Sequence, residues 1–108
     1  MPEQLTKRFY HYTHSIDVKS ILENGLLCER SLLKTCVFLA DRIVFMLPGI
    51  EWSDLLPDRV RLRVDLPLDW PLEKGTDNYI VAESFGTFIS MIDIPPEYIQ
   101  IDKEDILS

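Results

Sequence analysis

The residues from Val60 to Leu66 alternate strictly between apolar and charged side chains. Because successive side chains of a β-strand point to opposite faces of a sheet, this alternation predicts a strand with one buried and one solvent-facing side. Arg61 and Arg63 fall on the solvent-facing side, in phase with Arg59. We expect these arginines to be solvated and paired with nearby acidic residues, the alternative being a patch that binds phosphate or an acidic partner.

The rest of the chain divides into short apolar segments separated by turn residues. Such segments are typical of strands when they are rich in aromatic and β-branched residues. We expect five or six strands in all, the others over residues 9–13, 37–40, 79–82 and 85–91, with a terminal strand into which the two prolines of segment 94–101 lead. The segments over 79–82 and 85–91 are close enough in sequence to pair as a hairpin.

One helix is clearly indicated between Ser15 and Gly25. The Ser15 hydroxyl can cap its start by accepting a hydrogen bond from a backbone N–H of the first turn. Gly25 is a good stop because glycine tolerates positive φ. A brief second helix is expected to begin at Asp41 and to end before Pro48. Short strands with one or two short helices predict an α+β domain and argue against a doubly wound parallel sheet.

The length and composition indicate one globular domain over residues 1–108, with 46% hydrophobic and 27% charged residues. No apolar run approaches the ~20 residues that span a bilayer, and the first residues lack the features of a signal peptide. We therefore expect a cytoplasmic protein with no membrane partner. The net charge of −7 disfavours a general nucleic-acid binder. It suits an enzyme that acts on one nucleotide, or an inhibitor that docks on a basic protein partner.

Common catalytic and metal-binding motifs are absent from the sequence. The four glycines are scattered singly, so there is no Gly-rich phosphate loop. There is no nucleophile elbow and no pair of histidines at metal-binding spacing on a helix. Cys28 and Cys36 are eight positions apart without further ligands nearby. We expect a structural role for them and no metal site.

His11, Tyr12 and Thr13 are the most concentrated group of candidate ligand contacts. On a strand, His11 and Thr13 face the same side and Tyr12 faces the other. An imidazole and a hydroxyl on one face can bind the vicinal hydroxyls of a ribose, and the Tyr12 backbone can meet a planar carboxamide if this strand edge is unpaired. The alternative is an edge strand whose polar residues cap the following helix, and the tripeptide alone favours it. His14 is expected to be partly exposed at the helix start.

Several motifs occur in a characteristic order along the chain. They are the strand Phe9-Tyr10-His11-Tyr12-Thr13, the Gly25-Leu26 pair that ends the helix, the strand Val37-Phe38-Leu39-Ala40, and the late segment Ile94-Pro95-Pro96-Glu97-Tyr98-Ile99. Together they span most of the chain. In their order and placement they resemble the ADP-ribosyltransferase superfamily. The late segment is similar to one found in several branches, including the RNA 2′-phosphotransferase-like and DNA-modifying toxin-like groups.

The resemblance implies a compact α+β fold split into two sheets, with NAD bound between the sheets. It implies that His11 and Thr13 contact ribose hydroxyls and that Tyr12 offers its backbone to the nicotinamide amide. Phe38 occupies the position usually held by a tyrosine of this superfamily. Its ring can still stack on the nicotinamide, but it lacks the hydroxyl.

The resemblance also implies a catalytic carboxylate near the front of a late strand, acting together with His11. Glu83 is the best candidate, and Asp93 and Glu97 are its competitors. A carboxylate there would stabilise the positive charge that develops on the ribose as nicotinamide leaves. The implied function is transfer of ADP-ribose from NAD to a protein or nucleic-acid acceptor. The alternatives are a non-catalytic acidic interaction protein, inhibitor-like or antitoxin-like, on a degenerate form of this fold, and an RNA 2′-phosphotransferase-like enzyme.

Overall fold

The computed structural model describes residues 5–28, 37–56, 58–75, 78–79 and 84–102 of the chain. Within them the strands are β1 (Thr6–His14), β2 (Val37–Ala40), β3 (Phe45–Leu47), β4 (Ile50–Glu51), β5 (Arg59–Pro67), β6 (Glu73–Lys74), β7 (Asn78–Tyr79), β8 (Ser84–Phe85), β9 (Thr87–Ser90) and β10 (Ile99–Ile101). The helices are α1 (Val18–Asn24) and α2 (Trp52–Leu55), with 3-10 turns η1 (Ser15–Asp17) and η3 (Pro96–Tyr98). The α+β class is thereby confirmed.

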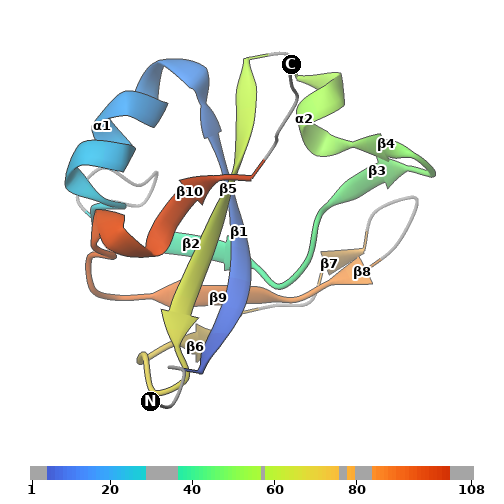
Figure 1. The fold of residues 1–108 in the computed structure, drawn as a ribbon. Helices are drawn as coiled ribbons and strands as arrows, with labels where there is room; N and C mark the ends of the chain where they lie inside the picture. The colour runs from blue at the N-terminus through green and yellow to red at the C-terminus, as the bar shows by residue number, and fades with distance from the viewer. Residues whose placement is uncertain (1–4, 29–36, 57, 76–77, 80–83, 103–108) are drawn as a thin grey trace.

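The centre of the fold is an antiparallel sheet of six strands in the order β10-β5-β1-β2-β9-β6 (Figure 1). β1 and β5 pair along their full length, from Thr6 opposite Pro67 to His14 opposite Arg59. β1 and β2, in contrast, share one register pair, Tyr10 opposite Ala40. Figure 1 shows β2 and β9 running across the direction of β1 and β5. The sheet therefore changes direction at this join, and a split into two sheets stays a prediction.

The core lies against the apolar side of β5, as the alternation of that strand predicts. Leu62, Val64 and Leu66 have no exposed surface. Phe9 of β1 packs edge-to-face on Phe88 of β9, with ring centroids 5.3 Å apart, and so connects the two directions of the sheet. The remaining buried members of the cluster are Leu26, Val37, Leu39, Ile94 and Ile99.

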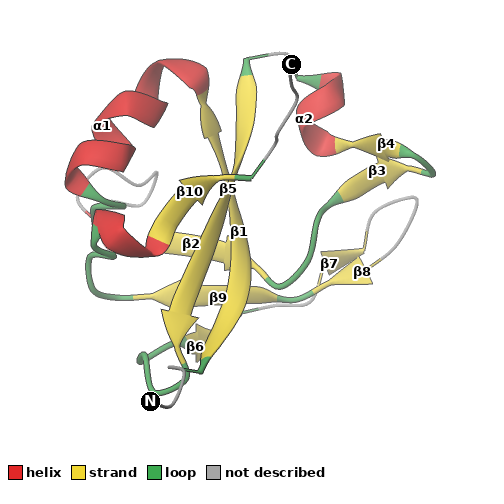
Figure 2. Ribbon diagram, viewed as in Figure 1, coloured by secondary structure: helices red, strands yellow, loops and turns green. Residues whose placement is uncertain are grey.

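Helix α1 covers one side of the central strands, and α2 with the β3–β4 pair lies on the other side in the view of Figure 2. α1 ends at Gly25, whose φ of 92° requires glycine and whose N–H donates to the Ile21 carbonyl at 2.7 Å. Leu26 then exchanges two backbone hydrogen bonds of 2.9 Å with Ile94. The end of the helix is thus joined directly to the start of the Ile94-Pro95-Pro96 segment. None of the helices in the described part of the chain is long and apolar enough to span a membrane.

Two expected elements differ from the structure. Ser15 lies inside η1, and neither η1 nor α1 has a side-chain cap at its start, so the predicted Ser15 cap is wrong. The predicted helix after Asp41 is also wrong, because Asp41 instead exchanges hydrogen bonds with Gly86 of a distant segment. The terminal strand follows the two prolines, as expected, and begins at Ile99 because Pro96 starts the 3-10 turn η3.

Cys28 has the structural role expected of it, and Trp70 has a structural role as well. Cys28 packs against the core, and its Sγ lies 3.7 Å from the Ser90 carbonyl oxygen. Trp70 is a local anchor, because its Nε1 donates to the Ser90 hydroxyl at 3.1 Å and its ring lies edge-to-face on Tyr98. β7 and β8 pair as a hairpin, in part as predicted, but β9, which covers most of the expected strand over 85–91, pairs with β2 and β6 instead. Cys36 and residues 80–82 lie outside the described residues.

Candidate functional site

The candidate site lies where β1 and β2 part. Along β1 the side chains alternate, so that His11 and Thr13 share the side of the buried Phe9. β2 provides no register partner to β1 beyond Tyr10 in the described ladder. There the His11 Nδ1 lies 2.8 Å from the Phe38 carbonyl oxygen. At His11, β1 is thus connected to β2 by a side-chain hydrogen bond, whereas at Tyr10 the two strands are connected by backbone pairing.

The Phe38 carbonyl fixes the tautomer of His11. A carbonyl oxygen only accepts hydrogen bonds, so Nδ1 must carry the proton and donate it. Nε2 is then the unprotonated nitrogen of the neutral ring. Burial lowers the pKa of His11, and the hydrogen bond to Phe38 opposes this effect without cancelling it. His11 is therefore neutral at pH 7, with a nitrogen ready to accept a hydrogen bond from a hydroxyl.

The lowered pKa of His11 predicts a specific pH dependence of stability. Between the folded pKa and about pH 6.5, the unfolded chain binds more protons than the folded one. The free energy of unfolding should therefore fall as the pH drops below about 6.5, with a His11 contribution of at most about 1.4 kcal/mol per pH unit. Urea unfolding of wild type and His11→Gln at about pH 7.5 and pH 5 measures this contribution as a difference. His14→Gln is the control, because it keeps His11. Equal pH dependence in wild type and His11→Gln would contradict the prediction.

Thr13 and Phe38 lie beside His11 in different environments. Thr13 is 9% exposed and sits opposite Val60 of β5. Phe38 is 37% exposed, because it points to the side of β2 opposite the buried Val37 and Leu39. His11 therefore meets the main chain of Phe38, while the Phe38 ring presents a partly open apolar face.

The three candidate carboxylates are not equivalent. Glu83 lies outside the described residues, so its position stays a prediction. The Asp93 Oδ1 accepts a hydrogen bond of 2.8 Å from the Cys28 backbone N–H and thereby ties two connecting segments together. Glu97 is exposed in the first turn of η3, as expected of a solvated turn residue. The hydrogen bond of Asp93 is structural and does not involve His11 or Phe38.

The other side of β1 carries a polar junction that the sequence did not indicate. The Tyr12 hydroxyl donates to Glu51 Oε2 at 2.9 Å and accepts from the Val44 N–H at 3.1 Å. Arg61 donates from its terminal nitrogen to Glu51 Oε1 and from Nε to Asp102 Oδ2 at 2.8 Å. Burial raises the pKa of Tyr12, so this hydroxyl stays protonated and remains a donor. Glu51 belongs to a segment that its sequence predicts to be a loop, and no local sequence pattern distinguishes it from its neighbours.

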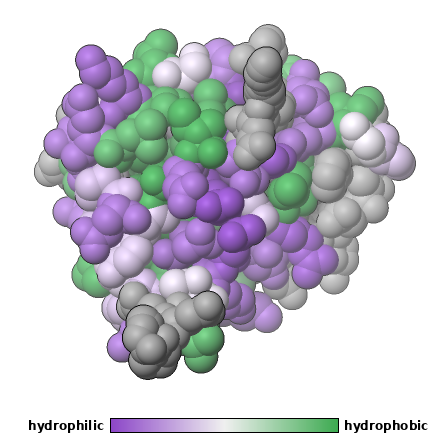
Figure 3. Space-filling model, viewed as in Figure 1, coloured by the Kyte–Doolittle hydropathy of each residue, from purple (hydrophilic) through white to green (hydrophobic). Residues whose placement is uncertain are grey.

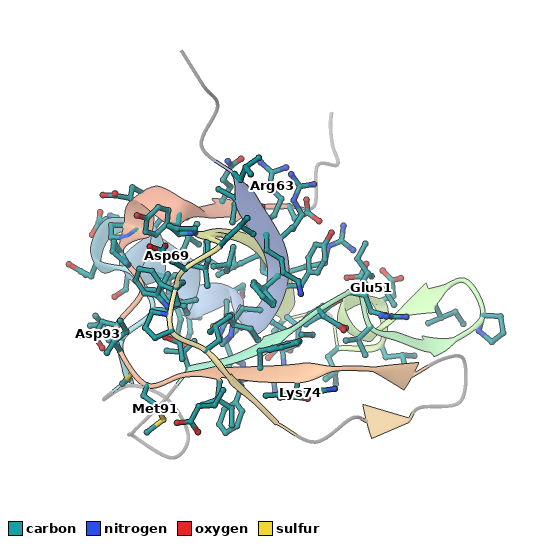
Figure 4. All side chains as sticks on the ribbon, turned by 90° about the horizontal axis from the view of Figure 1, so that it is seen from below. Glu51, Arg63, Asp69, Lys74, Met91 and Asp93 are labelled. Carbon is teal, nitrogen blue, oxygen red and sulfur yellow. The ribbon has the colours of Figure 1, made fainter. Side chains whose placement is uncertain are left out.

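The junction continues as a row of ion pairs across the outer face of β5, where hydrophilic residues gather in the middle of Figure 3. Arg63 lies 4.0 Å from Asp102 and donates from Nε to Asp65 at 3.1 Å. Arg8 reaches the other oxygen of Asp65 at 2.9 Å. In Figure 4, Glu51 lies towards the β3–β4 side and Arg63 lies near β1, away from Glu51. The expectation that Arg61 and Arg63 pair with acidic residues is confirmed, whereas the expectation of a solvated side chain is wrong for Arg61, which is 13% exposed.

Arg59 lies at the far end of β5 and contacts a different group. It donates to His14 Nε2, while His14 Nδ1 lies 3.5 Å from Asp58. The side chain of His14 is 50% exposed, in agreement with the expected position at the helix start. The three arginines of β5 thus all contact groups of this chain. This argues against a phosphate-binding patch on this strand.

Comparisons with protein-family models, with curated protein sequences and with solved structures give no match for this chain. Among the described residues, no group of three or more histidine, cysteine, aspartate or glutamate side chains could hold a metal ion.

Proposed function

We propose that this protein binds NAD at His11 and Phe38 and transfers ADP-ribose to an acceptor. The hydrogen bond between the His11 ring and the Phe38 carbonyl is the observation that supports this most strongly. The two residues are 27 positions apart and belong to two different motifs of the resemblance. The backbone pairing of Leu26 with Ile94 supports it further, because it joins the other two motifs.

Each residue of the site has a defined task in this proposal. Neutral His11 accepts a hydrogen bond from a ribose hydroxyl at Nε2, and Thr13 supports the same ribose. The partly exposed Phe38 ring stacks on the nicotinamide, and the Tyr12 backbone meets the carboxamide. These contacts would orient the substrate for reaction.

The reaction breaks the bond between the ribose carbon and the nicotinamide nitrogen, and nicotinamide leaves with the bonding electron pair. The positive charge that develops on the ribose requires a carboxylate nearby, and Glu83 is the residue proposed for that task. The acceptor nucleophile then forms the new bond to the same carbon and loses its proton. A split of the sheet into two halves around the substrate belongs to this proposal as well.

A non-catalytic interaction protein is the second candidate. It is favoured by Phe38, which lacks the hydroxyl of the usual tyrosine, and by the net charge of −7, which suits a basic protein partner. An RNA 2′-phosphotransferase activity is less supported, because it needs basic residues that converge on the site. The strand from Arg59 to Arg63 is the only proposed source of such residues. Its arginines instead contact Glu51, Asp65, Asp102 and His14 of this chain.

Calorimetric titration with NAD, combined with a nicotinamide-release assay, tests the proposal. Wild type is expected to bind at millimolar NAD, and His11→Ala should bind about tenfold more weakly because a hydrogen bond to the ribose is lost. Glu83→Gln should keep binding but release nicotinamide on the order of 100-fold more slowly. Glu97→Gln is the matched control, since Glu97 is exposed in η3.

The outcomes separate the two candidates. Absence of binding at millimolar NAD rejects the transferase and favours the interaction protein. Undiminished binding by His11→Ala would put the nucleotide site elsewhere on the chain.

A further inference from the structure

Beyond Tyr10, two side-chain hydrogen bonds connect β1 to β2 and to the segment that follows β2. The first is the His11 ring on the Phe38 carbonyl, at 2.8 Å. The second is the Tyr12 hydroxyl, which accepts the Val44 N–H at 3.1 Å. The chain segment from Phe38 to Val44 is therefore pinned at both ends to two consecutive residues of β1.

Glu51 stabilises the second of these contacts, the one made by the Tyr12 hydroxyl. One of its carboxylate oxygens accepts the Tyr12 hydroxyl at 2.9 Å, and the other accepts Arg61. Its backbone N–H donates to the Asp54 side chain at 3.0 Å, at the start of α2. Glu51 is buried, so water has little access to this junction. A buried carboxylate with both oxygens engaged keeps its partners in one geometry, because any shift would leave a charge unpaired.

The position of Tyr12 links this junction to the candidate site. Tyr12 lies between His11 and Thr13 on a strand, so its side chain points away from them while its backbone is shared with theirs. The Tyr12 and His11 rings are attached to consecutive residues of the same backbone, so a shift of that backbone moves both rings. The contact between His11 and Phe38 depends on that backbone, because β2 has no register partner for β1 there.

We propose that Glu51 is a positioning residue of the candidate site. Through the Tyr12 hydroxyl it sets the spacing between β1 and the segment from Phe38 to Val44, and hence the alignment of His11 with Phe38. This inference rests on the proposed NAD binding for its functional consequence, whereas the coupling between Glu51 and His11 is independent of any ligand.

Two variants and one matched control test the coupling. Tyr12→Phe removes the hydroxyl, and Glu51→Gln keeps the shape of the side chain but removes its charge. Asp65→Asn is the control, because Asp65 pairs with Arg8 and Arg63 in the same row of ion pairs without touching Tyr12 or the segment from Phe38 to Val44. For each variant we would measure urea unfolding, amide hydrogen exchange at Val44, the imidazole NMR signals of His11, and the Kd for NAD.

Tyr12→Phe and Glu51→Gln are expected to speed exchange of the Val44 amide about fivefold to tenfold, as loss of one hydrogen bond implies. Both should shift the His11 imidazole signals and weaken NAD binding about tenfold, whereas Asp65→Asn should keep the NAD Kd within about twofold. Unchanged NAD affinity in Tyr12→Phe and Glu51→Gln would overturn the proposal. So would a loss of affinity that simply follows the loss of stability in all three variants.

The ligand-free measurements keep this test separate from that of the proposed function. If wild type binds no NAD, the proposed function fails, and the coupling is judged from His11 alone. Shifted His11 signals in Tyr12→Phe then support the positioning role. Unshifted His11 signals together with faster Val44 exchange reject it.

Discussion

Gly25→Ala is expected to lower the free energy of unfolding by about 3 kcal/mol or more. A Cβ on residue 25 would lie 2.2 Å from the Ile94 carbonyl oxygen, closer than any stable contact allows. The carbonyl cannot easily retreat, because it accepts the Leu26 N–H at 2.9 Å and Ile94 is fully buried. The φ of 92° adds backbone strain for any residue with a side chain. Urea denaturation followed by circular dichroism measures the loss.

Gly49→Ala provides the matched control for this substitution. Gly49 also has a positive φ, of 78°, but a Cβ there would meet no heavy atom within 4 Å. Gly49→Ala should therefore lower the free energy of unfolding by about 1 kcal/mol, which is the cost of the backbone conformation alone. The difference between the two variants isolates the collision with Ile94. If both variants lost the same free energy of unfolding, the close approach of Gly25 to Ile94 would be wrong.

Arg61→Leu is expected to lower the free energy of unfolding by about 3 kcal/mol. The Arg61 side chain is 13% exposed and pairs with Glu51 and Asp102, which are 8% and 16% exposed. Removal of the guanidinium leaves the buried Glu51 carboxylate without its cation and leaves Asp102 with only Arg63, 4.0 Å away. The desolvation of Glu51 is then uncompensated, and this cost exceeds the value of the ion pair itself.

Arg8→Leu is the control for Arg61→Leu, because Arg8 makes the same kind of pair with Asp65 but is 52% exposed. It should cost at most about 1 kcal/mol, as exposed ion pairs do. The double variant Arg61→Leu/Glu51→Leu should recover part of the loss, because one orphaned carboxylate is removed with the cation. Equal effects of Arg8→Leu and Arg61→Leu would show that the junction at Glu51 is open to water.

Much of the fold could be predicted because it depends on local patterns. The alternation from Val60 to Leu66 assigned the buried side of β5 correctly, since the side-chain period of a strand is independent of its neighbours. Gly25 ended the helix as expected, because its positive φ is a local demand. The expectations about Ser15 and Asp41 failed for the opposite reason. Asp41 can cap a helix locally, but its exchange of hydrogen bonds with Gly86 takes precedence in the folded chain.

The same distinction between local patterns and tertiary contacts applies to the candidate site. The sequence by itself determined that His11 and Thr13 share one side of a strand, that Tyr12 faces the other, and that Arg61 lies on a charged face. Only the tertiary structure decided which atoms these groups meet: the Phe38 carbonyl for His11, and Glu51 for both Tyr12 and Arg61. The physical reason is that strand periodicity sets the direction of a side chain from its neighbours in sequence. The partners of that side chain depend instead on how β1 and β2 cross and on how the chain returns over the outer face of β5. No short sequence pattern encodes either arrangement.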